Sequence, residues 1–295
     1  MKLVAFVLPF GRSRQSLLPL LLLLTLPAVV QAQFQFITNN GVITITKYTG
    51  SGGVVTIPSM TNGYPVACIQ GYALSNCPFT SVWIPNSVTN IGEGAFASCP
   101  FLTNVTLPNS VTSIADSLFA HCPSLTGVTI PRGITSIGLY AFAVCGSLSN
   151  VTIPASVTNI GQYAFQSCAG LRGVYCQGNA PSAYYNVFYD DNYVTVYYLP
   201  GTTGWDKWVS PPPAVLWDPL MQANGPGFGV HANQFGFNIT SRTNLPLPIV
   251  VEACTNLTSA SWTALQTCTL TNGSIYFSDA AWTNYPCRFY RIRSP

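Results

Sequence analysis

One pattern of apolar and polar residues recurs every 23 residues through the middle of the chain. Each copy reads V-x-[IL]-P-x-x-[VI]-T-x-I, and a Phe-x-x-Cys motif begins five residues after the final Ile. The four clearest copies begin at Val82, Val105, Val128 and Val151. A fixed period of this length is typical of repeat architectures and predicts stacked structural units.

Weaker copies flank these four. A copy that begins at Val54 carries an insertion around Asn62–Pro65, and a degenerate copy begins at Val174. Pro200 lies two full periods after the proline of the fourth clear copy, so Tyr197–Pro200 is predicted to open a truncated seventh unit.

The repeat predicts a solenoid, because one unit has apolar side chains that only its neighbours can cover. V-x-I-P predicts a short strand with its first and third side chains inward, which the proline ends. V-T-x-I-G predicts a second extended stretch, and A-F-x-x-C predicts a helical turn with Phe inward. The apolar positions of one unit are Val105, Leu107, Val111, Ile114, Phe119, Cys122 and Leu125.

This pattern resembles the BspA-type leucine-rich repeat over about residues 54–200. The resemblance implies a curved repeat scaffold, mainly β with short helical turns, in secreted or surface proteins of bacteria. Such scaffolds are often assigned to adhesion or protein binding, and the resemblance does not imply a particular partner.

Both ends of a solenoid need a cap. Phe34–Tyr48 alternates in hydropathy and contains Asn40-Gly41, which predicts an N-terminal capping hairpin within residues 33–53. The solenoid with its C-terminal cap is then assigned to residues 54–210. Ala183–Trp217 is rich in Tyr and Trp, which favours a C-terminal cap, with an aromatic platform for glycans as the alternative.

Beyond Pro211–Pro213 the period ends. Residues 211–222 are interpreted as a Pro-rich linker, and 223–295 as a small, all-β, sandwich-like module. Its expected strands are Phe235–Ile239, Ile249–Ala253, Trp262–Leu270, Ser274–Phe277 and Arg288–Ile292. The segments FGFNIT, VVEACTNL and RFYRIRSP resemble a C-terminal β module of exported bacterial proteins.

Charge separates the N-terminus from the rest of the chain. Lys2, Arg12 and Arg14 precede an apolar run that ends at Val30-Gln31-Ala32, which predicts a signal peptide over residues 1–32, cleaved near Ala32. Without it, the formal charge of +3 falls to zero, with eight basic and eight acidic residues. A neutral chain excludes electrostatic nucleic-acid binding. We expect a secreted or cell-surface protein with no transmembrane segment after cleavage.

Five of the ten cysteines occupy one repeat position. Stacked units would place them in a column, and we interpret them as a structural ladder of buried thiols. The ladder consists of Cys77, Cys99, Cys122, Cys145 and Cys168. In the C-terminal module, Cys254, Cys268 and Cys287 allow at most one bridge, and a Cys254–Cys268 disulfide is predicted.

The chain offers few groups for catalysis. His121 and His231 have no evident carboxylate partner in the sequence, and Asp190-Asp191 is interpreted as turn chemistry, with a glycosidase or calcium pair as the alternative. No phosphate-binding or dinucleotide motif occurs, and no metal or cofactor is expected. The sequence favours a protein that is not an enzyme.

The middle residue of each V-x-I strand is expected to point outward. This column gives a candidate binding surface of Trp83, Thr106, Thr129, Thr152, Tyr175 and Tyr198. Threonine also suits exposed strands that have no function. The leading hypothesis is an exported, non-catalytic, monomeric protein that binds a protein or cell-surface glycan. A carbohydrate-binding accessory protein is the alternative, and a hydrolase is less favoured.

Overall fold

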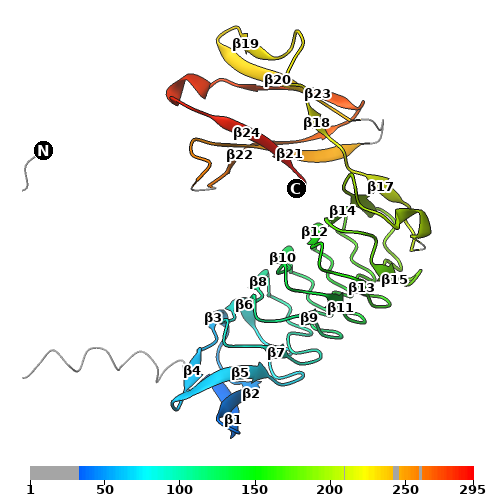
Figure 1. Cartoon of the computed structure of the whole chain (residues 1–295). Helices are drawn as coiled ribbons and strands as arrows, with labels where there is room; N and C mark the ends of the chain where they lie inside the picture. Colours follow the sequence, from blue (N-terminus) through cyan, green and yellow to red (C-terminus); the bar gives the residue numbers. More distant parts are fainter. Residues whose placement is uncertain (1–32, 209, 242–245, 259–260) are drawn as a thin grey trace, which may run out of the picture.

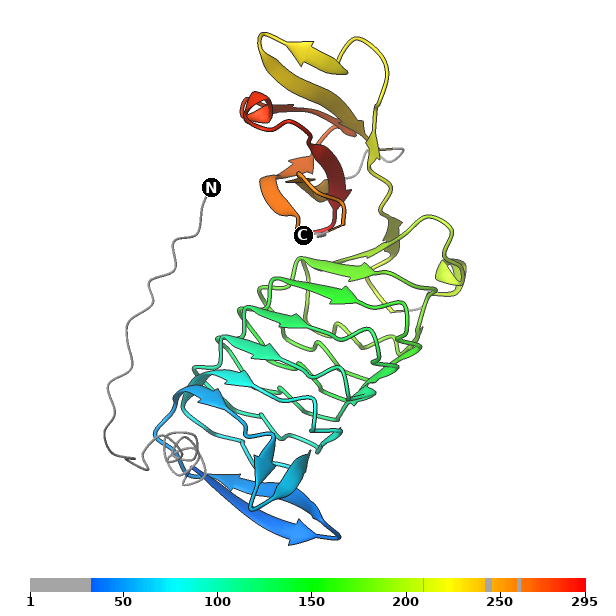
Figure 2. The ribbon, with the colours of Figure 1, turned by 60° about the vertical axis from the view of Figure 1, so that its left-hand side comes forward.

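The computed structural model describes residues 33–208, 210–241, 246–258 and 261–295 (Figure 1). The predicted signal peptide lies outside these residues. Coils stack from a hairpin at the N-terminal end of the described chain toward a separate β module at the C-terminal end, as the second view shows (Figure 2). The predicted fold class is confirmed: a mainly-β solenoid of about seven turns precedes a small β domain. We number the coils from the N-terminal end. Coil one begins at Val54, coil two at Val82, and coil six at Val174.

The N-terminal hairpin closes the first coil. Strands β1 (Phe34–Asn39) and β2 (Val42–Tyr48) pair antiparallel, and Asn40 and Gly41 in the turn between them both have positive φ. β2 also pairs in parallel with β5 (Tyr64–Ile69) of the first coil. The hairpin therefore continues the backbone ladder of one wall and covers its end.

One wall of the solenoid consists of short parallel strands that start each coil. They form two four-stranded sheets, with the orders β10-β8-β6-β3 and β12-β14-β16-β17. The strands are β3 (Gly53–Thr56), β6 (Phe79–Trp83), β8 (Asn104–Thr106), β10 (Gly127–Thr129), β12 (Asn150–Ile153), β14 (Gly173–Cys176), β16 (Thr195–Tyr198) and β17 (Ala214–Leu216). We call this wall the V-x-I face.

A second wall consists of two-residue strands from the V-T-x-I stretch. β5 pairs with β7, and β9, β11, β13 and β15 form a parallel sheet. Their bounds are β4 (Met60–Thr61), β7 (Asn90–Ile91), β9 (Ser113–Ile114), β11 (Ser136–Ile137), β13 (Asn159–Ile160) and β15 (Ser182–Ala183). β4 belongs to the insertion of coil one and pairs antiparallel with β5.

The third wall differs from the prediction. The A-F-x-x-C segments form tight turns instead of helical turns, and their amides bond to the next coil. The bonds between coils two and three run from Gly94 to Asp116, from Phe96 to Leu118 and from Ser98 to Ala120, at 2.9, 3.1 and 2.8 Å. Residues with positive φ recur in these turns. With this backbone conformation, every second N–H group of the turn points toward the next coil. A helix would satisfy its amides within one coil and lose these bonds.

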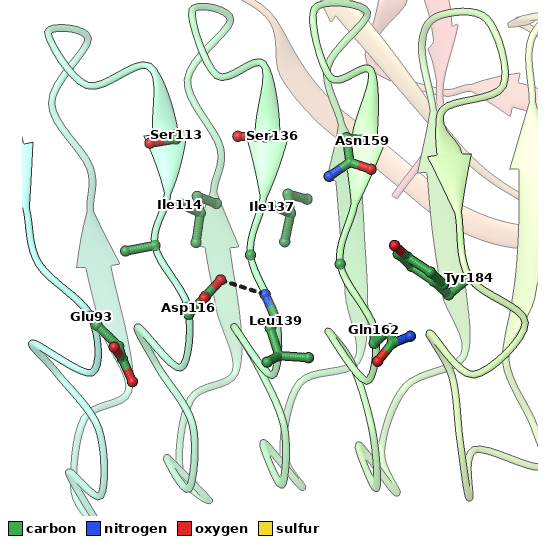
Figure 3. Close-up of a pocket in the computed structure, with 13 residues that line it drawn as sticks. Glu93, Ser113, Ile114, Asp116, Ser136, Ile137, Leu139, Asn159, Gln162 and Tyr184 are labelled. Atoms are coloured by element: carbon green, nitrogen blue, oxygen red, sulfur yellow. Dashed lines mark hydrogen bonds between the residues drawn. The ribbon is translucent and has the colours of Figure 1, made fainter.

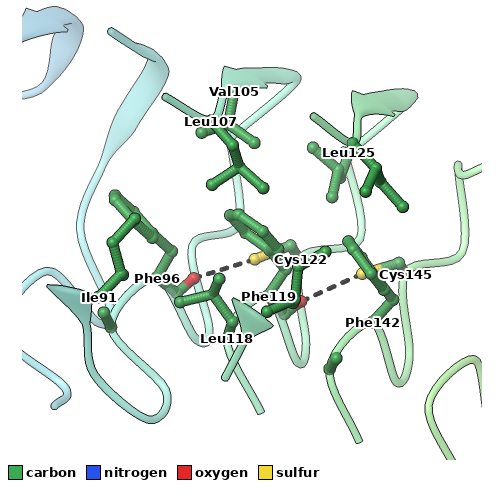
Figure 4. Packing of buried hydrophobic residues seen from close by; sticks show 14 of the residues in the cluster. Ile91, Phe96, Val105, Leu107, Leu118, Phe119, Cys122, Leu125, Phe142 and Cys145 are labelled. Atoms are coloured by element: carbon green, nitrogen blue, oxygen red, sulfur yellow. Dashed lines mark hydrogen bonds between the residues drawn. The ribbon is translucent and has the colours of Figure 1, made fainter. Parts of the chain in front are cut away.

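Stacked phenylalanines fill the middle of the solenoid (Figure 4). Phe96, Phe119 and Phe142 are fully buried, and their ring centroids lie 5.6 and 5.5 Å apart. The column continues through Phe165 to Phe188 in coil six. Aromatic pairs at this spacing add to the stabilisation from burial alone.

The ladder cysteines lie beside this column. All five are buried and free of disulfides. Four thiols donate to the carbonyl of a residue in the preceding coil, as Cys122 Sγ does to Phe96 at 3.2 Å and Cys145 Sγ to Phe119 at 3.1 Å (Figure 4). The thiol thus fills a small space in the core and satisfies a carbonyl in the turn.

The C-terminal module is a sandwich of two antiparallel sheets. One contains β18 (Leu220–Met221), β19 (Gly229–His231), β20 (Gln234–Thr240) and β23 (Ser274–Asp279). The other contains β21 (Leu247–Cys254), β22 (Thr263–Leu270) and β24 (Phe289–Arg293). Each of the five expected strands forms. Two short 3₁₀ helices complete the chain, η1 (Trp205–Lys207) and η2 (Trp282–Asn284).

Residues 211–222, predicted as a linker, contain paired strands. β17 extends the V-x-I face by pairing with β16, and β18 pairs with β20 of the module. The module packs on the solenoid, since Tyr197 Oη donates to the Pro246 carbonyl at 3.2 Å and Trp217 Nε1 to the Pro248 carbonyl at 3.0 Å. Apolar residues around the prolines provide a packing surface, which the Pro-rich composition alone did not indicate.

The module also contains the ion pairs of the described chain. Arg291 and Arg293 both bond to Glu252, with nitrogen–oxygen distances of 2.7 and 2.6 Å, and Arg288 pairs with Asp279 at 3.0 Å. The solenoid therefore depends on backbone ladders and apolar packing, whereas the module adds ion pairs between arginines and the buried acids Glu252 and Asp279.

We expect Phe119→Ala to destabilise the solenoid by about 3–5 kcal/mol, because it removes a fully buried ring between two stacked neighbours. Chemical denaturation of the 33–295 chain measures the loss. Phe101→Ala is the matched control, since the Phe101 ring is 57% exposed. Equal effects of the two changes would contradict the role of the column.

We expect Val144→Asn to stabilise the protein by about 1 kcal/mol. Val144 has φ of 60°, a conformation that is costly for a β-branched residue and tolerated by Asn, which occupies the equivalent turn position at Asn76. Thermal unfolding measures the gain. Val54→Asn makes the same exchange at an exposed strand position and should give no gain.

Candidate functional site

The V-x-I face presents part of the predicted binding column. Trp83, Thr106 and Thr129 lie opposite one another on successive parallel strands, and Trp83 is 51% exposed. Thr129 and Thr152 border a shallow depression of about 480 Å³, which Arg132 and Gln177 also line. These four predicted residues share one face.

The last two predicted residues do not belong to this surface. Tyr175 is buried under the C-terminal module, with only 3% of its surface exposed. Tyr197 stands opposite Tyr175 instead of Tyr198, because coil six has one residue fewer before its next strand. Tyr198 pairs with Cys176 and stacks on Trp205 at 5.0 Å, so it belongs to the cap.

A column of threonines on the second wall uses its hydroxyl groups within the protein. Thr135 Oγ1 donates to the Thr112 carbonyl at 3.1 Å, and Thr158 Oγ1 to the Thr135 carbonyl at 3.3 Å. The amides of Thr135 and Thr158 bond to the same carbonyls. These threonines therefore strengthen the ladder between coils instead of offering free hydroxyl groups.

Next to this column a groove crosses the strands β9, β11 and β13 (Figure 3). Its volume is about 680 Å³. One side carries the polar side chains of Ser113, Ser136 and Asn159, and Tyr184 lies at the C-terminal end. The floor contains small residues, and Gly138 and Gly161 lie so close to the preceding coil that a Cβ atom would collide with its backbone.

The groove combines free polar groups with few charges. In the described part of the chain, the side chains of Ser113, Ser136 and Asn159 make no hydrogen bond within the protein. Its two acids, Glu93 and Asp116, already have partners: Tyr72 Oη donates to Glu93 at 2.7 Å and the Leu139 amide donates to Asp116 at 2.8 Å. The groove is suited to hydrogen bonding with an extended, uncharged segment.

Sequence reasoning missed this groove, although its signal was present. The residue before the buried Ile of V-T-x-I is polar in every clear copy, as Asn90, Ser113, Ser136 and Asn159. The groove itself depends on the small residues that follow the Ile, whose effect on the surface emerges only when coils stack.

The aromatic segment Ala183–Trp217 divides into two groups. Trp205 and Trp208 pack against the solenoid core, with ring centroids 5.5 Å apart, and form the C-terminal cap. The other group projects from coil six with 51–73% of each side chain exposed. It consists of Tyr184, Tyr185, Tyr189 and Tyr193.

The candidate catalytic groups do not converge. Asp190 accepts a long hydrogen bond from exposed Ser167 at 3.4 Å, whereas Asp191 occupies the ladder position and its carboxylate oxygens are buried. His121 lies in an exposed turn with φ of 59°, and His231 lies on β19 of the distant module. Over the described ranges, no three His, Cys, Asp or Glu side chains gather as metal ligands.

The predicted Cys254–Cys268 disulfide is wrong. Both thiols are free, and the register of β21 with β22 places Cys268 opposite Ile249. Cys254 instead stands opposite Phe289 on β24. The spacing of the two cysteines along the chain does not give the register of the strands that carry them, which places Cys268 five residues along β21 from Cys254.

We expect only exposed Cys287 to react rapidly with a thiol reagent at pH 8, and half-buried Cys68 and Cys268 to react slowly. Burial, with a smaller contribution from neighbouring charges, raises the pKa values of Cys77 and Cys168 to about 12, so few of these thiols are ionised. Ellman titration should show the seven buried thiols only after denaturation. Rapid labelling of the folded Cys287→Ser variant would contradict this.

The chain matches a known repeat family. The model of the BspA type leucine rich repeat region matches residues 67–195 in six copies. The match runs from β5 of coil one to the first residue of β16. No helix in the described residues is long and apolar enough to cross a membrane. A comparison with curated proteins found no match.

Solved structures of bacterial repeat proteins are similar to part of the chain. A leucine rich repeat protein of T. pallidum is 37% identical over 49% of this chain and 69% of its own, with a TM-score of 0.47. A leucine rich cell surface protein of Faecalibacterium prausnitzii is 32% identical over 49% and 53%, with a TM-score of 0.30. A leucine-rich repeat protein of Bacteroides ovatus is 22% identical over 60% and 55%, with a TM-score of 0.44.

Proposed function

Because this chain belongs to the BspA-type leucine-rich repeat proteins, we propose that it is an exported, non-catalytic binding protein that recognises a protein at a cell surface. The groove over β9, β11 and β13 carries this proposal. It offers an elongated surface with unused polar side chains, whereas the neighbouring threonines are already bonded.

The character of the groove favours an extended, largely uncharged segment of a partner. Ser and Asn side chains can donate to and accept from a peptide backbone. Glu93 and Asp116 each accept a hydrogen bond from a neutral donor and keep their negative charge, so the groove disfavours an acidic segment. Trp83 and the threonines of the V-x-I face provide a second surface for the same partner.

We expect Ser136→Trp, which fills the groove from an outward strand position, to weaken binding at least about tenfold. Surface plasmon resonance with the 33–295 chain against immobilised extracellular matrix proteins, together with flow cytometry on intact cells, measures binding. Trp83→Ala tests the V-x-I face in the same assay.

Tyr276→Ala, which truncates an exposed aromatic residue of the C-terminal module, is the matched control and should leave binding unchanged. Unchanged binding by both Ser136→Trp and Trp83→Ala would contradict recognition by the solenoid. Absence of binding to every protein and cell tested would contradict the function itself.

The exposed tyrosines of coil six favour one alternative, a carbohydrate-binding accessory protein. Tyrosine rings commonly contact sugars through their apolar faces and hydroxyl groups. A glycan array would show retention that Tyr185→Ala and Tyr193→Ala reduce, whereas a blank array would count against this alternative.

A further inference from the structure

Coil six breaks the cysteine ladder with a carboxylate. Asp191 lies 23 residues after Cys168 and takes the next ladder position. Burial, reinforced by the charge of Asp190 and opposed by the Cys168 amide, raises the pKa of Asp191 to about 7. Neither carboxylate oxygen accepts a hydrogen bond of ordinary geometry, although both are shielded from solvent.

A cavity of about 400 Å³ adjoins this carboxylate. Asp191 lines it together with Asn186, whose side chain is 95% buried and whose Oδ1 also has no hydrogen-bond donor. Three buried acceptor atoms, the Oδ1 of Asn186 and both carboxylate oxygens of Asp191, therefore belong to residues that line one cavity. None of them accepts a hydrogen bond of ordinary geometry within the protein. A buried acceptor without a donor is costly, so a ligand that donates would stabilise this arrangement.

Among the described residues, no lysine, arginine or histidine forms an ion pair with Asp190 or Asp191. Every ion pair in the described ranges lies in the C-terminal module. Arg172 donates to the carbonyls of Ala169 and Leu171 and lies 5.1 Å from the centre of the Tyr193 ring. Asp190 adds a second acid to the lining of the cavity.

Two exposed tyrosines complete the lining. Tyr185 and Tyr189 are 70% and 58% exposed, so the site combines acceptors, negative charge and aromatic rings. An ammonium group matches all three: it donates three hydrogen bonds, carries positive charge and is attracted to aromatic faces. A neutral sugar would bring no positive charge to the two acids, Asp190 and Asp191, that line the cavity.

We propose that the cavity bounded by Asn186, Asp191 and Tyr189 binds the primary ammonium group of a lysine side chain. The site lies in coil six and is separate from the Ser136 groove. It gives a partner protein a second, charge-selective contact. Its test uses a small amine and is independent of any result on the groove.

The test measures binding of N-acetyl-lysine methylamide to the 33–295 chain by NMR titration. The neutral analogue N-acetyl-norleucine methylamide is compared with it. We expect the lysine derivative to bind and the norleucine derivative to bind at least about tenfold more weakly, because charge-assisted hydrogen bonds are the stronger ones.

Two variants remove the charge of Asp191 and are chosen to preserve the coil. Asp191→Cys restores the ladder residue, whose thiol can donate to the Phe165 carbonyl as its equivalents do in earlier coils. Asp191→Asn keeps the shape of the side chain. Both should weaken lysine binding at least about tenfold, whereas Asp206→Asn, at an exposed carboxylate outside the cavity, should not.

Binding should also strengthen as pH rises from 6 to 8, because the ammonium group requires the ionised carboxylate and displaces its proton. The other titratable groups around Asp191 are Asp190, the Cys168 thiol, and the phenols of Tyr185 and Tyr189. Burial raises the pKa of Cys168 to about 12, so it stays neutral in this range. Asp191→Asn should abolish the pH dependence.

Three results would overturn the proposal: no binding of the lysine derivative, equal binding of the norleucine derivative, or lysine binding that Asp191→Cys leaves unchanged. Calcium chloride titrated alone is the competing probe. Calcium binding that depends on Asp191, without lysine binding, would assign the cavity to an inorganic cation instead.

Discussion

Hydrogen bonds between the backbones of successive coils are the constraint on which the rest of the structure depends. They occur on the V-x-I wall, on the V-T-x-I wall and in the turns that contain the Phe-x-x-Cys motif. Because each bond must find its partner in the next coil, one unit length of 23 residues is kept through coils two to five. The stacked phenylalanines and the cysteine ladder follow from that regularity, since equal units place equal residues above one another.

The periodic part of the fold could be predicted from the sequence because each apolar column repeats. Phe96, Phe119 and Phe142 were assigned inward from spacing alone, and all three are fully buried. The turn conformation could not be predicted in this way. The motif around Ala95-Phe96 is compatible with a helical turn. In the structure, however, the amide of Phe96 bonds to the carbonyl of Leu118 in the next coil, 22 positions away, and no local pattern indicates that partner.

The outward column of the V-x-I face could be predicted only where successive coils have the same length. Trp83 and Thr106 lie side by side as their spacing indicates. The prediction is wrong for Tyr198, because coil six is one residue short and Tyr197 takes the position opposite Tyr175. It is wrong for Tyr175, because the C-terminal module covers that side chain. Which residues a second domain covers depends on packing between distant segments, and the repeat carries no information about that packing. Asp191 shows the converse, because its significance appears only against the column of cysteines that it interrupts.

The stacked architecture also affects how this protein could change in evolution. Each interior coil contacts only the coil before it and the coil after it, and both junctions use the same bonds. Duplication of 23 codons would therefore insert one further layer, about 4.8 Å thick, without creating a new kind of junction. The groove across β9, β11 and β13 would lengthen by one polar side chain, while the hairpin and the Asp191 cavity would remain at their ends. The length of the groove is thus open to change by whole-coil duplication or deletion, independently of both ends.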